Sequence, residues 1–243
     1  MHAAIVSGVS RGLGEALAVE LLGLGFRVLG VGRTNSPQLA ERDAYRFVAC
    51  DFGRPAALPA ALASAFAAMA AERPESACLV NNAATIESVG VMGRLDATKI
   101  EHSIAVNVTA PVVLADLFLR TFPDDRVGRR IVNVSSGAAQ SPLSGEGLYC
   151  VAKAGLEMLT RMLAAEAPAG RLRAITLRPG VIDTRMQTFA RSQPRDVLPS
   201  VDLFVGFHEN GQLVAPAVVA RKVVERLVLA EVEQGRTYSY AEL

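Results

Sequence analysis

Ser7-Gly8-Val9-Ser10-Arg11-Gly12-Leu13-Gly14 stands between a short apolar run, residues 3–7, and a periodic apolar stretch, residues 12–24. Glycine lets the backbone turn tightly and lets a ligand phosphate approach it closely. A helix that begins at such a turn aims its free N–H groups and its dipole at that phosphate. An ordinary strand–helix turn would also fit, but the position directly after a strand favours a phosphate-binding turn.

Apolar runs typical of strands alternate with helical runs along the rest of the chain. The predicted strands cover residues 3–7, 27–31, 45–49, 77–81, 130–134 and 173–177. The predicted helices cover residues 12–24, 55–71, 97–119, 148–166 and 216–230. This alternation predicts parallel strands joined by right-handed crossovers. The expected fold class is therefore α/β, a doubly wound parallel sheet of Rossmann type flanked by helices.

The chain of 243 residues is 51% hydrophobic and 20% charged, with a net charge of +1, which is typical of one soluble domain covering residues 1–243. No basic block suggests nucleic acid, and no apolar run approaches the roughly 20 residues of a membrane span. Residues 185–215 interrupt the alternation and contain Pro194 and Pro199. A segment of that length is often a binding loop, and we expect it to bind substrate.

The three cysteines, Cys50, Cys78 and Cys150, show no metal-ligand spacing. We interpret them as buried thiols in a reducing cytoplasm, and we assign no metal. The N-terminal residues show no targeting segment, so the expected location is cytoplasmic.

The identity of the dinucleotide follows from the end of the second predicted strand. The NAD-binding pattern places an acidic residue about 20 positions after the glycine turn, where it binds the ribose 2′-hydroxyl. No Asp or Glu occurs between Glu20 and Glu41, and the strand is followed by Arg33-Thr34. Arg33, with Arg11 inside the turn, can bind a 2′-phosphate through charged donors. The sequence therefore favours NADP(H) over NAD.

A proton-transfer pair is predicted in the helix over residues 148–166. Tyr149 and Lys153 are four positions apart, so their side chains share one face of that helix. A free tyrosine has a pKa near ~10, and a neighbouring cation favours the phenolate and lowers that pKa. The spacing alone is weak evidence, because it arises by chance in many helices.

Together these motifs resemble the classical short-chain dehydrogenase/reductase family over essentially the whole chain. The motifs that carry the resemblance are the glycine turn, Asp51, Asn81-Asn82-Ala83-Ala84, Asn107, Ser135-Ser136, Tyr149 with Lys153, and Pro179-Gly180-Val181-Ile182-Asp183-Thr184. The family usually has glycine where Ala84 stands, a small departure.

The resemblance implies four catalytic residues. Tyr149 is similar to the general acid that protonates the carbonyl oxygen as hydride reaches carbon. Ser136 matches the hydroxyl that steadies that oxygen, and Ser135 is the weaker candidate. Lys153 matches the lysine that binds the nicotinamide ribose and lowers the tyrosine pKa. Asn107 matches the asparagine that holds a water of the proton relay.

The resemblance also implies an NADP(H) site. Asp51 and Phe52 are expected to border the adenine, and Asn82 its ribose, while Ile182 and Thr184 are expected to hold the carboxamide. The full expected set is Gly8, Ser10, Arg11, Gly12, Leu13, Gly14, Arg33, Thr34, Asp51, Phe52, Asn82, Ala83, Tyr149, Lys153, Pro179, Gly180, Ile182 and Thr184.

Within the family the chain is most similar to the sepiapterin reductase-like and bacterial benzil reductase-like group. The expected activity is NADPH-dependent reduction of a small carbonyl substrate, a ketone or diketone, beside the apolar candidates Leu148, Met186, Phe189 and Phe204. A pterin substrate is disfavoured because residues 235–240 contain no acid. Three alternatives stay open: sepiapterin reductase activity, 3-oxoacyl-thioester reductase activity, and a regulatory module that senses NADP(H) without turnover.

Family members commonly pair through the helices that correspond to residues 97–119 and 148–166, so a homodimer or homotetramer is expected. The sequence does not separate the residues of these helices that lie in the core from those in an interface. The candidates for either are Ala110, Leu114, Phe118, Met158 and Met162.

Overall fold

The computed structural model describes residues 1–122, 127–167 and 172–243. Its strands form one parallel sheet with the order β3-β2-β1-β4-β5-β6-β7. The strands are β1 (His2–Ser7), β2 (Arg27–Gly32), β3 (Tyr45–Ala49), β4 (Ser76–Asn81), β5 (Gly128–Val134), β6 (Leu172–Arg178) and β7 (Thr237–Ser239). The order reverses between β1 and β4, which is where open α/β sheets bind ligands.

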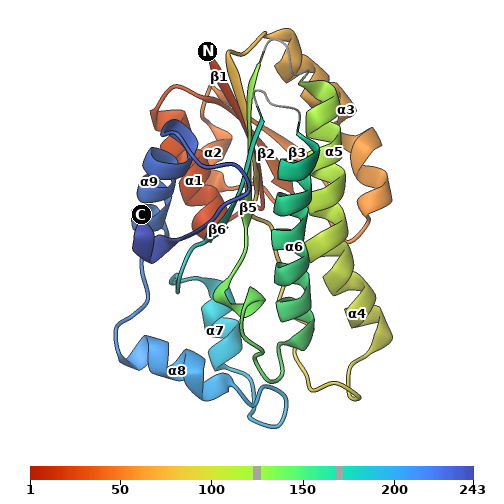
Figure 1. Cartoon of the computed structure of the whole chain (residues 1–243), viewed down its shortest axis with the longest axis vertical. Helices are drawn as coiled ribbons and strands as arrows, with labels where there is room; N and C mark the ends of the chain where they lie inside the picture. The colour runs from red at the N-terminus through yellow and green to blue at the C-terminus, as the bar shows by residue number, and fades with distance from the viewer. Residues whose placement is uncertain (123–126, 168–171) are drawn as a thin grey trace.

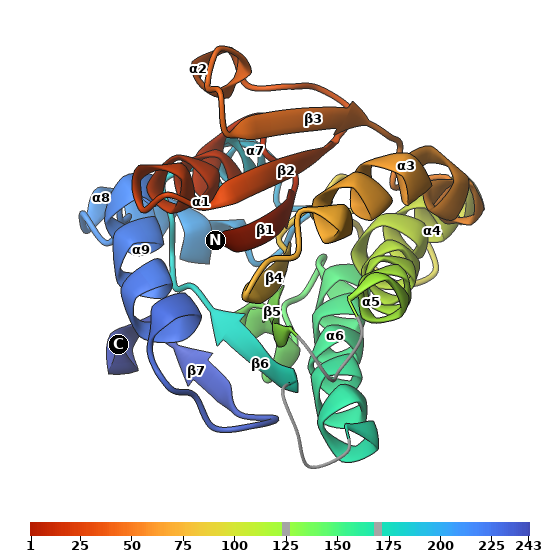
Figure 2. The same ribbon diagram turned by 90° about the horizontal axis from the view of Figure 1, so that it is seen from above.

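Helices cover both faces of the sheet (Figure 2). One face carries α1 (Gly12–Gly23) and α9 (Pro216–Val223), and the other carries α3 (Leu58–Ala71), α5 (Ala110–Thr121) and α6 (Gly147–Glu166). Alternate strand residues enter the two cores: Ile5 packs on the α3 side and Val6 on the α1 side. Strands buried on both faces explain the continuous apolar runs of the sequence, and the doubly wound prediction is confirmed.

The predicted elements lie within two or three residues of the observed ones, but one strand and three α-helices among the described residues were missed. The missed ones are β7, α2 (Pro37–Ala40), α7 (Arg185–Arg191) and α8 (Val201–Glu209). In place of the single helix predicted over 97–119, the structure has three consecutive elements: α4 (Ala97–Ile104), a π-helical turn (Ala105–Thr109) and α5. The helix predicted over 216–230 is α9 followed by a second π-helical stretch, Val224–Leu229.

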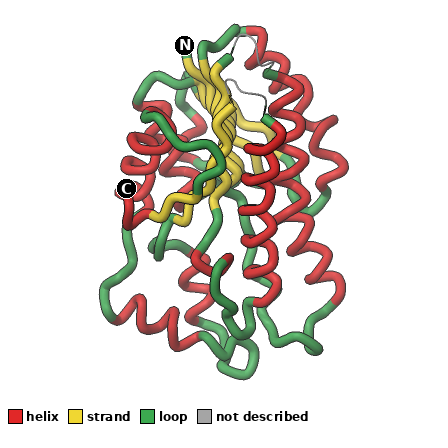
Figure 3. Tube along the Cα trace, in the orientation of Figure 1, coloured by secondary structure: helices red, strands yellow, loops and turns green. Residues whose placement is uncertain are grey.

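The expectation that residues 185–215 form a loop was wrong in its secondary structure, because α7 and α8 occupy much of the segment (Figure 3). Both helices lie below the sheet in Figure 1, beyond the carboxyl ends of the strands. Pro194 and Pro199 fall between the two helices and keep each one short. Many apolar residues of the segment, which looked scattered in sequence, share one cluster, although Leu203 is exposed and Val214 packs against another cluster.

One helical run among the described residues, Ala97–Thr121, meets the length and hydropathy of a membrane span. Half of its most apolar window is buried inside the fold, as in the core helix of a soluble protein. This run is longer and more apolar than the sequence analysis allowed for, but it is weak evidence for a membrane.

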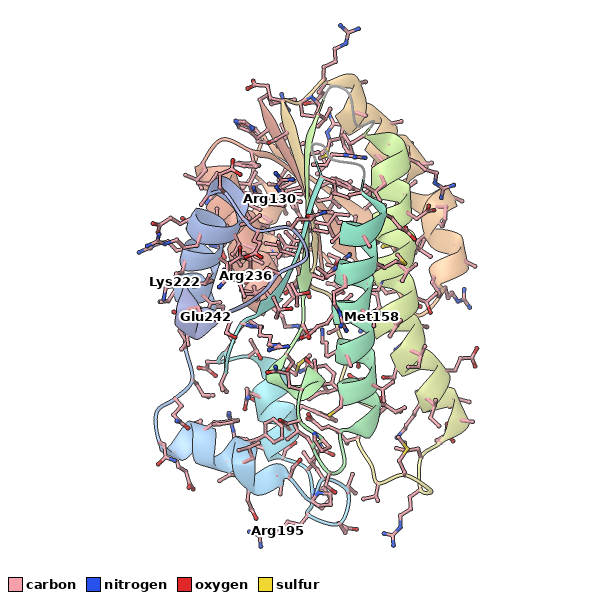
Figure 4. The ribbon with its side chains drawn as sticks, in the orientation of Figure 1. Arg130, Met158, Arg195, Lys222, Arg236 and Glu242 are labelled. Atoms are coloured by element: carbon pink, nitrogen blue, oxygen red, sulfur yellow. The ribbon has the colours of Figure 1, made fainter. Side chains whose placement is uncertain are left out.

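The structure separates the apolar candidates of α5 and α6 into two groups. Ala110, Leu114 and Phe118 are buried against the sheet. Met158, labelled on α6 in Figure 4, and Met162 are 55% and 41% exposed. The two methionines therefore belong to an uncovered face of α6 and not to the core of this chain.

Candidate active site

The predicted site residues collect at one edge of the sheet. Parallel strands all end at the same edge, so the segments that follow neighbouring strands meet there. The segments that follow β1 to β6 begin with Gly8, Arg33, Cys50-Asp51, Asn82, Ser135-Ser136 and Pro179. Residues far apart in sequence are thus brought to a single site by the strand order.

The turn between β1 and α1 requires its glycines. Gly8 and Gly12 have φ values of +76° and +64°, which side chains other than glycine rarely adopt. A Cβ atom on Gly14 would overlap the carbonyl oxygen of Gly8. Arg11 is the N-cap of α1 and its side chain makes no capping bond. The first N–H groups of α1 are therefore left to an anionic ligand, which fits the diphosphate of a dinucleotide.

The strands on either side of the switch point are tied together by Ser7 and Asn82. The Ser7 hydroxyl accepts hydrogen bonds from the backbone N–H groups of Asn82 and Ala83, at 2.9 and 3.0 Å. The Asn82 amide donates to the carbonyls of Ser7, at 2.9 Å, and Gly8, at 3.3 Å. Asn82 thus holds the glycine turn in place, in addition to its expected position near the adenine ribose.

Replacing Asn82 with alanine is expected to lower the free energy of unfolding by about 1–3 kcal/mol, because two partly buried carbonyls lose their donor. The glycine turn should loosen at the same time, so NADPH should bind more weakly. Denaturant unfolding and a fluorescence titration with NADPH measure the two effects. Asn210→Ala, on an exposed asparagine after α8, is the matched control and should change neither.

The segment that carries Arg33 and Thr34 is anchored by side chains that the sequence analysis did not single out. The Tyr45 hydroxyl donates to Oδ1 of Asn35 at 2.7 Å. The buried Ser36 donates its hydroxyl to the carboxylate of Glu15, in the first turn of α1. These bonds fix the loop beside the glycine turn.

Arg11 and Arg33 remain exposed beside this turn. No hydrogen bond or ion pair involves either side chain within the described residues, and no acidic side chain follows β2 to occupy them. The guanidinium groups are consequently available to a phosphate. Their contact with a 2′-phosphate remains a prediction.

The other residues predicted near the adenine lie after β3. Asp51 accepts a hydrogen bond from the backbone of Gly53 at 2.9 Å, which shapes the turn. Phe52 is buried in the core on the α3 side. A Cβ atom on Gly53 would lie 2.8 Å from the ring of His102 in α4, so α4 closes this end of the site.

The segment after β6 closes over the glycine turn. Thr184 is the N-cap of α7, but its side chain makes no capping hydrogen bond, so the hydroxyl is free for another partner. A Cβ atom on Gly12 would lie 3.4 Å from the Thr184 methyl group. Ile182 is buried and pairs with Val214 as an isolated bridge. Pro179 is buried beside Gly180, whose φ is +74°.

Tyr149 and Lys153 share one face of α6, as predicted. The Lys153 ammonium lies 5.4 Å from the centre of the Tyr149 ring and donates to the carbonyl of Val134 at 2.7 Å. Lys153 is only 2% exposed, and burial lowers its pKa to about 8. The two groups are therefore positioned as a pair at the end of β5.

The expectation that Lys153 lowers the pKa of Tyr149 is not met in this structure. Burial raises the pKa of the phenol, and the negative charge of Glu146 raises it further. A hydrogen bond with the Ser136 side chain acts in the opposite direction and is the smaller influence. The phenol is thus held in its protonated form, which is the form that a general acid needs.

Ser136 and Ser135 have different surroundings, and these favour Ser136 as the catalytic hydroxyl. The hydrogen bond to Tyr149 places Ser136 at the reacting group. Ser135 is buried and donates instead to the Glu157 carboxylate at 2.9 Å and the Lys153 carbonyl at 3.3 Å. Arg178 binds the same carboxylate through two hydrogen bonds, of 2.7 and 2.8 Å. Through the Glu157 carboxylate, Ser135 and Arg178 hold the middle of α6 against the ends of β5 and β6.

Asn107 lies in the π-helical turn between α4 and α5, a feature often found at functional sites. Its amide exchanges two hydrogen bonds with the backbone of Thr85, both at 2.8 Å. It also donates to the Ser103 hydroxyl at 3.3 Å. The side chain therefore fixes the segment after β4, and the expected contact with a relay water remains a prediction.

An apolar cluster surrounds Tyr149 at the carboxyl edge of the sheet. Met186, from α7, approaches the Tyr149 hydroxyl, with its sulfur 4.0 Å away. Phe189 and Phe204 belong to the cluster, and their contact with substrate remains a prediction. Leu148 is buried but lies outside the cluster, because neighbouring residues of a helix point in different directions. The members that the sequence did not predict are Ile86, Val89, Leu143, Ala190, Leu198, Val201, Val205 and Phe207.

Metal-ligating side chains do not gather in the parts of the chain that the structure covers, where no group of three or more His, Cys, Asp or Glu could hold an ion. Burial raises the pKa of Cys50 to about 11 and that of Cys78 to about 12. Both thiols are thus protonated, but only Cys78 is buried as the sequence predicted, because Cys50 and Cys150 are partly exposed.

The chain is similar in sequence to known reductases. Residues 2–195 match the family model described as short chain dehydrogenase. The chain is 28% identical to the benzil reductase ((S)-benzoin forming) of Bacillus cereus, over 97% of either protein. It is 34% identical to the sepiapterin reductase of Meriones unguiculatus, over 79% of this chain and 78% of that protein.

Solved structures share the fold over nearly the whole chain. The KRED1-Pglu enzyme has a TM-score of 0.86 and 28% identity, covering 98% of this chain and 100% of the other. A short chain dehydrogenase from Burkholderia cenocepacia J2315, in complex with NADP, has a TM-score of 0.78 and 25% identity. That match covers 97% of this chain and 94% of the other.

Proposed function

Because the chain belongs to the short-chain dehydrogenase family, we propose that it is an NADPH-dependent reductase of small ketones and diketones. One observation carries the proposal: the Tyr149 phenol, hydrogen-bonded to Ser136 and 5.4 Å from the Lys153 ammonium, lies within an apolar cluster at the edge of the sheet. The benzil reductase and sepiapterin reductase relatives act on carbonyl compounds by name, which supports this assignment.

The catalytic step needs a proton donor, a partner for the carbonyl oxygen and a hydride source. NADPH supplies the hydride when it is bound. Tyr149 gives its proton to the carbonyl oxygen, and the Ser136 hydroxyl donates a hydrogen bond to the same oxygen and stabilises its developing negative charge. Lys153 places a positive charge beside Tyr149 and stabilises the phenolate that remains. The apolar cluster excludes water from the carbonyl.

The preference for NADPH follows from the segment after β2. Arg33 and Arg11 present charged donors to a 2′-phosphate, and no carboxylate is placed there to bind the 2′-hydroxyl of NADH. The bonds Tyr45–Asn35 and Ser36–Glu15 hold the loop in place before the cofactor arrives. Because this loop loses less conformational freedom when NADPH binds, the complex with NADPH is tighter.

Replacing Arg33 with alanine is expected to raise KM for NADPH by about tenfold or more, because a charge-assisted hydrogen bond to phosphate is lost. KM for NADH should change less than threefold, since NADH has no 2′-phosphate. Steady-state kinetics with both cofactors give the comparison. Arg42→Ala, on another exposed arginine, should leave both constants unchanged. An equal rise of KM for both cofactors would contradict the role of Arg33.

The proposal is tested by NADPH oxidation against 1,2-diketones, aromatic ketones, sepiapterin and acetoacetyl thioesters, with NADH in parallel. Turnover of ketones or diketones with NADPH preferred is the expected result. Preferential turnover of sepiapterin or of the thioesters would instead support a sepiapterin reductase or a 3-oxoacyl-thioester reductase. Tight NADPH binding without turnover of any substrate would favour an NADP(H)-sensing module.

The uncovered face of α6 supports a homodimer or homotetramer. Val151, Met158 and Met162 are exposed on α6, and Val112 is exposed on α5. Apolar side chains gathered on adjacent helices often mark a contact between proteins. Sedimentation of the purified protein tests this assembly, and fractionation of the source cells tests the proposed cytoplasmic location.

A further inference from the structure

Glu146 is a buried carboxyl group at the active site that the mechanism above does not use. It is the N-cap of α6 and is only 4% exposed. Its side chain makes no capping hydrogen bond, and no hydrogen bond or ion pair to it is found within residues 1–122, 127–167 and 172–243. A largely desolvated carboxyl group without a partner among these residues is costly, which points to a function for it.

Glu146 lies between two members of the apolar cluster around Tyr149. Leu143 and Tyr149 belong to that cluster, three residues before and after Glu146. The Glu146 N–H donates to the carbonyl of Leu143 at 3.0 Å, so the chain turns tightly there. Glu146 directly precedes the first turn of α6, and Tyr149 is the third residue of that turn. Glu146 is therefore close to the position where Tyr149 meets a carbonyl oxygen.

The segment before Glu146 is held rigidly. The Gly145 carbonyl accepts a hydrogen bond from the Gly90 N–H at 2.7 Å. The Ser144 carbonyl accepts one from the Ser200 hydroxyl at 2.9 Å. Gly145 has a φ of +88°, and a Cβ atom there would lie 2.8 Å from the Val197 carbonyl oxygen. Hydrogen bonds from Gly90 and Ser200 thus fix the backbone just before Glu146. A fixed backbone limits the positions that the Glu146 carboxyl group can take.

Electrostatics supports the proximity of the two side chains. The negative charge of Glu146 raises the pKa of Tyr149, so the two groups interact. Burial raises the pKa of Glu146 itself to about 7. At neutral pH the group therefore exists both as an acid, which donates a hydrogen bond, and as a carboxylate, which accepts one.

We propose that Glu146 is a specificity-determining residue that hydrogen-bonds a second oxygen of the substrate, on the carbon next to the carbonyl that Tyr149 protonates. This inference rests on the proposed carbonyl reductase function. The acid form donates to the second carbonyl of a 1,2-diketone, and the carboxylate accepts from the hydroxyl of an α-hydroxyketone. A simple ketone leaves Glu146 without a partner, so the preferred substrates are vicinal dioxygenated ketones.

A purely structural role makes a different prediction. A negative charge at the N-terminus of α6 is stabilised by the helix dipole, whatever the substrate. Losing that contribution would lower stability and would affect all substrates alike. Selectivity between substrates of one carbon skeleton separates the two roles.

The experiment compares propiophenone, 2-hydroxypropiophenone and 1-phenyl-1,2-propanedione in the wild type, Glu146→Gln and Glu146→Leu. The readout is kcat/KM for each vicinal dioxygenated substrate divided by kcat/KM for propiophenone. Because each ratio is compared between enzymes, the intrinsic reactivity of the substrates cancels. Glu146→Leu should lower both ratios by about tenfold or more, mainly through KM. Glu146→Gln, which keeps a donor and an acceptor, should retain most of the preference.

The control is Glu87→Leu, which removes an exposed carboxylate from the segment after β4 and should leave both ratios unchanged. Ratios that stay within twofold of the wild type in Glu146→Leu, while all three substrates are reduced, would overturn the role of Glu146 and leave the reductase function intact. No NADPH-dependent reduction of these or any other carbonyl compound by the wild type would overturn the reductase function and the inference together.

Discussion

Replacing Tyr149 with phenylalanine is expected to lower kcat/KM for ketone reduction by about 10²–10⁴-fold, the usual contribution of a positioned general acid. The phenylalanine ring keeps the packing against the apolar cluster, so the protein should fold normally. The hydroxyl is the group that burial and the Glu146 charge hold in its protonated form. Its removal deletes the proton donor without changing the rest of the site.

Steady-state kinetics on the best ketone of the panel measure this loss, and a fluorescence titration measures NADPH binding. The dissociation constant of NADPH should stay within a few fold of the wild type, because the phosphate and adenine contacts are made elsewhere. Tyr238→Phe is the matched control, since the Tyr238 hydroxyl accepts a hydrogen bond from the Glu233 N–H in the C-terminal segment. Full ketone reduction by Tyr149→Phe would remove Tyr149 from the mechanism.

The sequence was sufficient for those parts of the fold and site that depend on local patterns. The glycine turn could be predicted because a side chain is excluded locally at three positions: Gly8 and Gly12 have positive φ values, and a Cβ atom on Gly14 would overlap the Gly8 carbonyl. Tyr149 and Lys153 share a helix face by spacing alone. The edge of the sheet where these segments meet follows from the alternation of strands and helices.

The features that the sequence did not predict depend on tertiary contacts. The paired hydrogen bonds between Asn107 and Thr85 join residues 22 positions apart, and no periodic pattern signals them. The distinction between buried Phe118 and exposed Met158 depends on which face of each helix meets the sheet. In α7 and α8, intervening prolines and short apolar stretches concealed helices that are stabilised by a shared cluster.

The pKa of Tyr149 is the clearest case in which a local rule was overridden. The spacing of Tyr149 and Lys153 predicted a lowered pKa, but the structure surrounds the phenol with apolar side chains and the Glu146 carboxyl group. Desolvation penalises the phenolate and outweighs the nearby cation. The signal was present in the sequence as a glutamate one helical turn before the tyrosine, but its burial was not.

Replacing Lys153 with methionine is expected to lower kcat/KM by about 10²-fold or more, because the positive charge that stabilises the Tyr149 phenolate is lost. KM for NADPH should rise as well, since Lys153 is expected to bind the nicotinamide ribose. Lys99→Met, on an exposed lysine of α4, is the control and should change neither constant. Unchanged kinetics in Lys153→Met would contradict both assigned roles.

Lys153 should also make stability depend on pH, with a defined sign. Burial lowers its pKa from 10.5 to about 8, so between these values the unfolded chain binds more protons than the folded chain. The free energy of unfolding of the wild type should therefore rise, relative to that of Lys153→Met, as the pH increases from 8, by about 1 kcal/mol over the first pH unit. Denaturant unfolding of both proteins at several pH values up to about 9 measures this difference. The thiols of Cys50 and Cys78, whose pKa values are raised by burial, are present in both proteins, so their contributions cancel in this difference. A difference that does not change with pH would mean that the Lys153 amine is not desolvated in the folded protein.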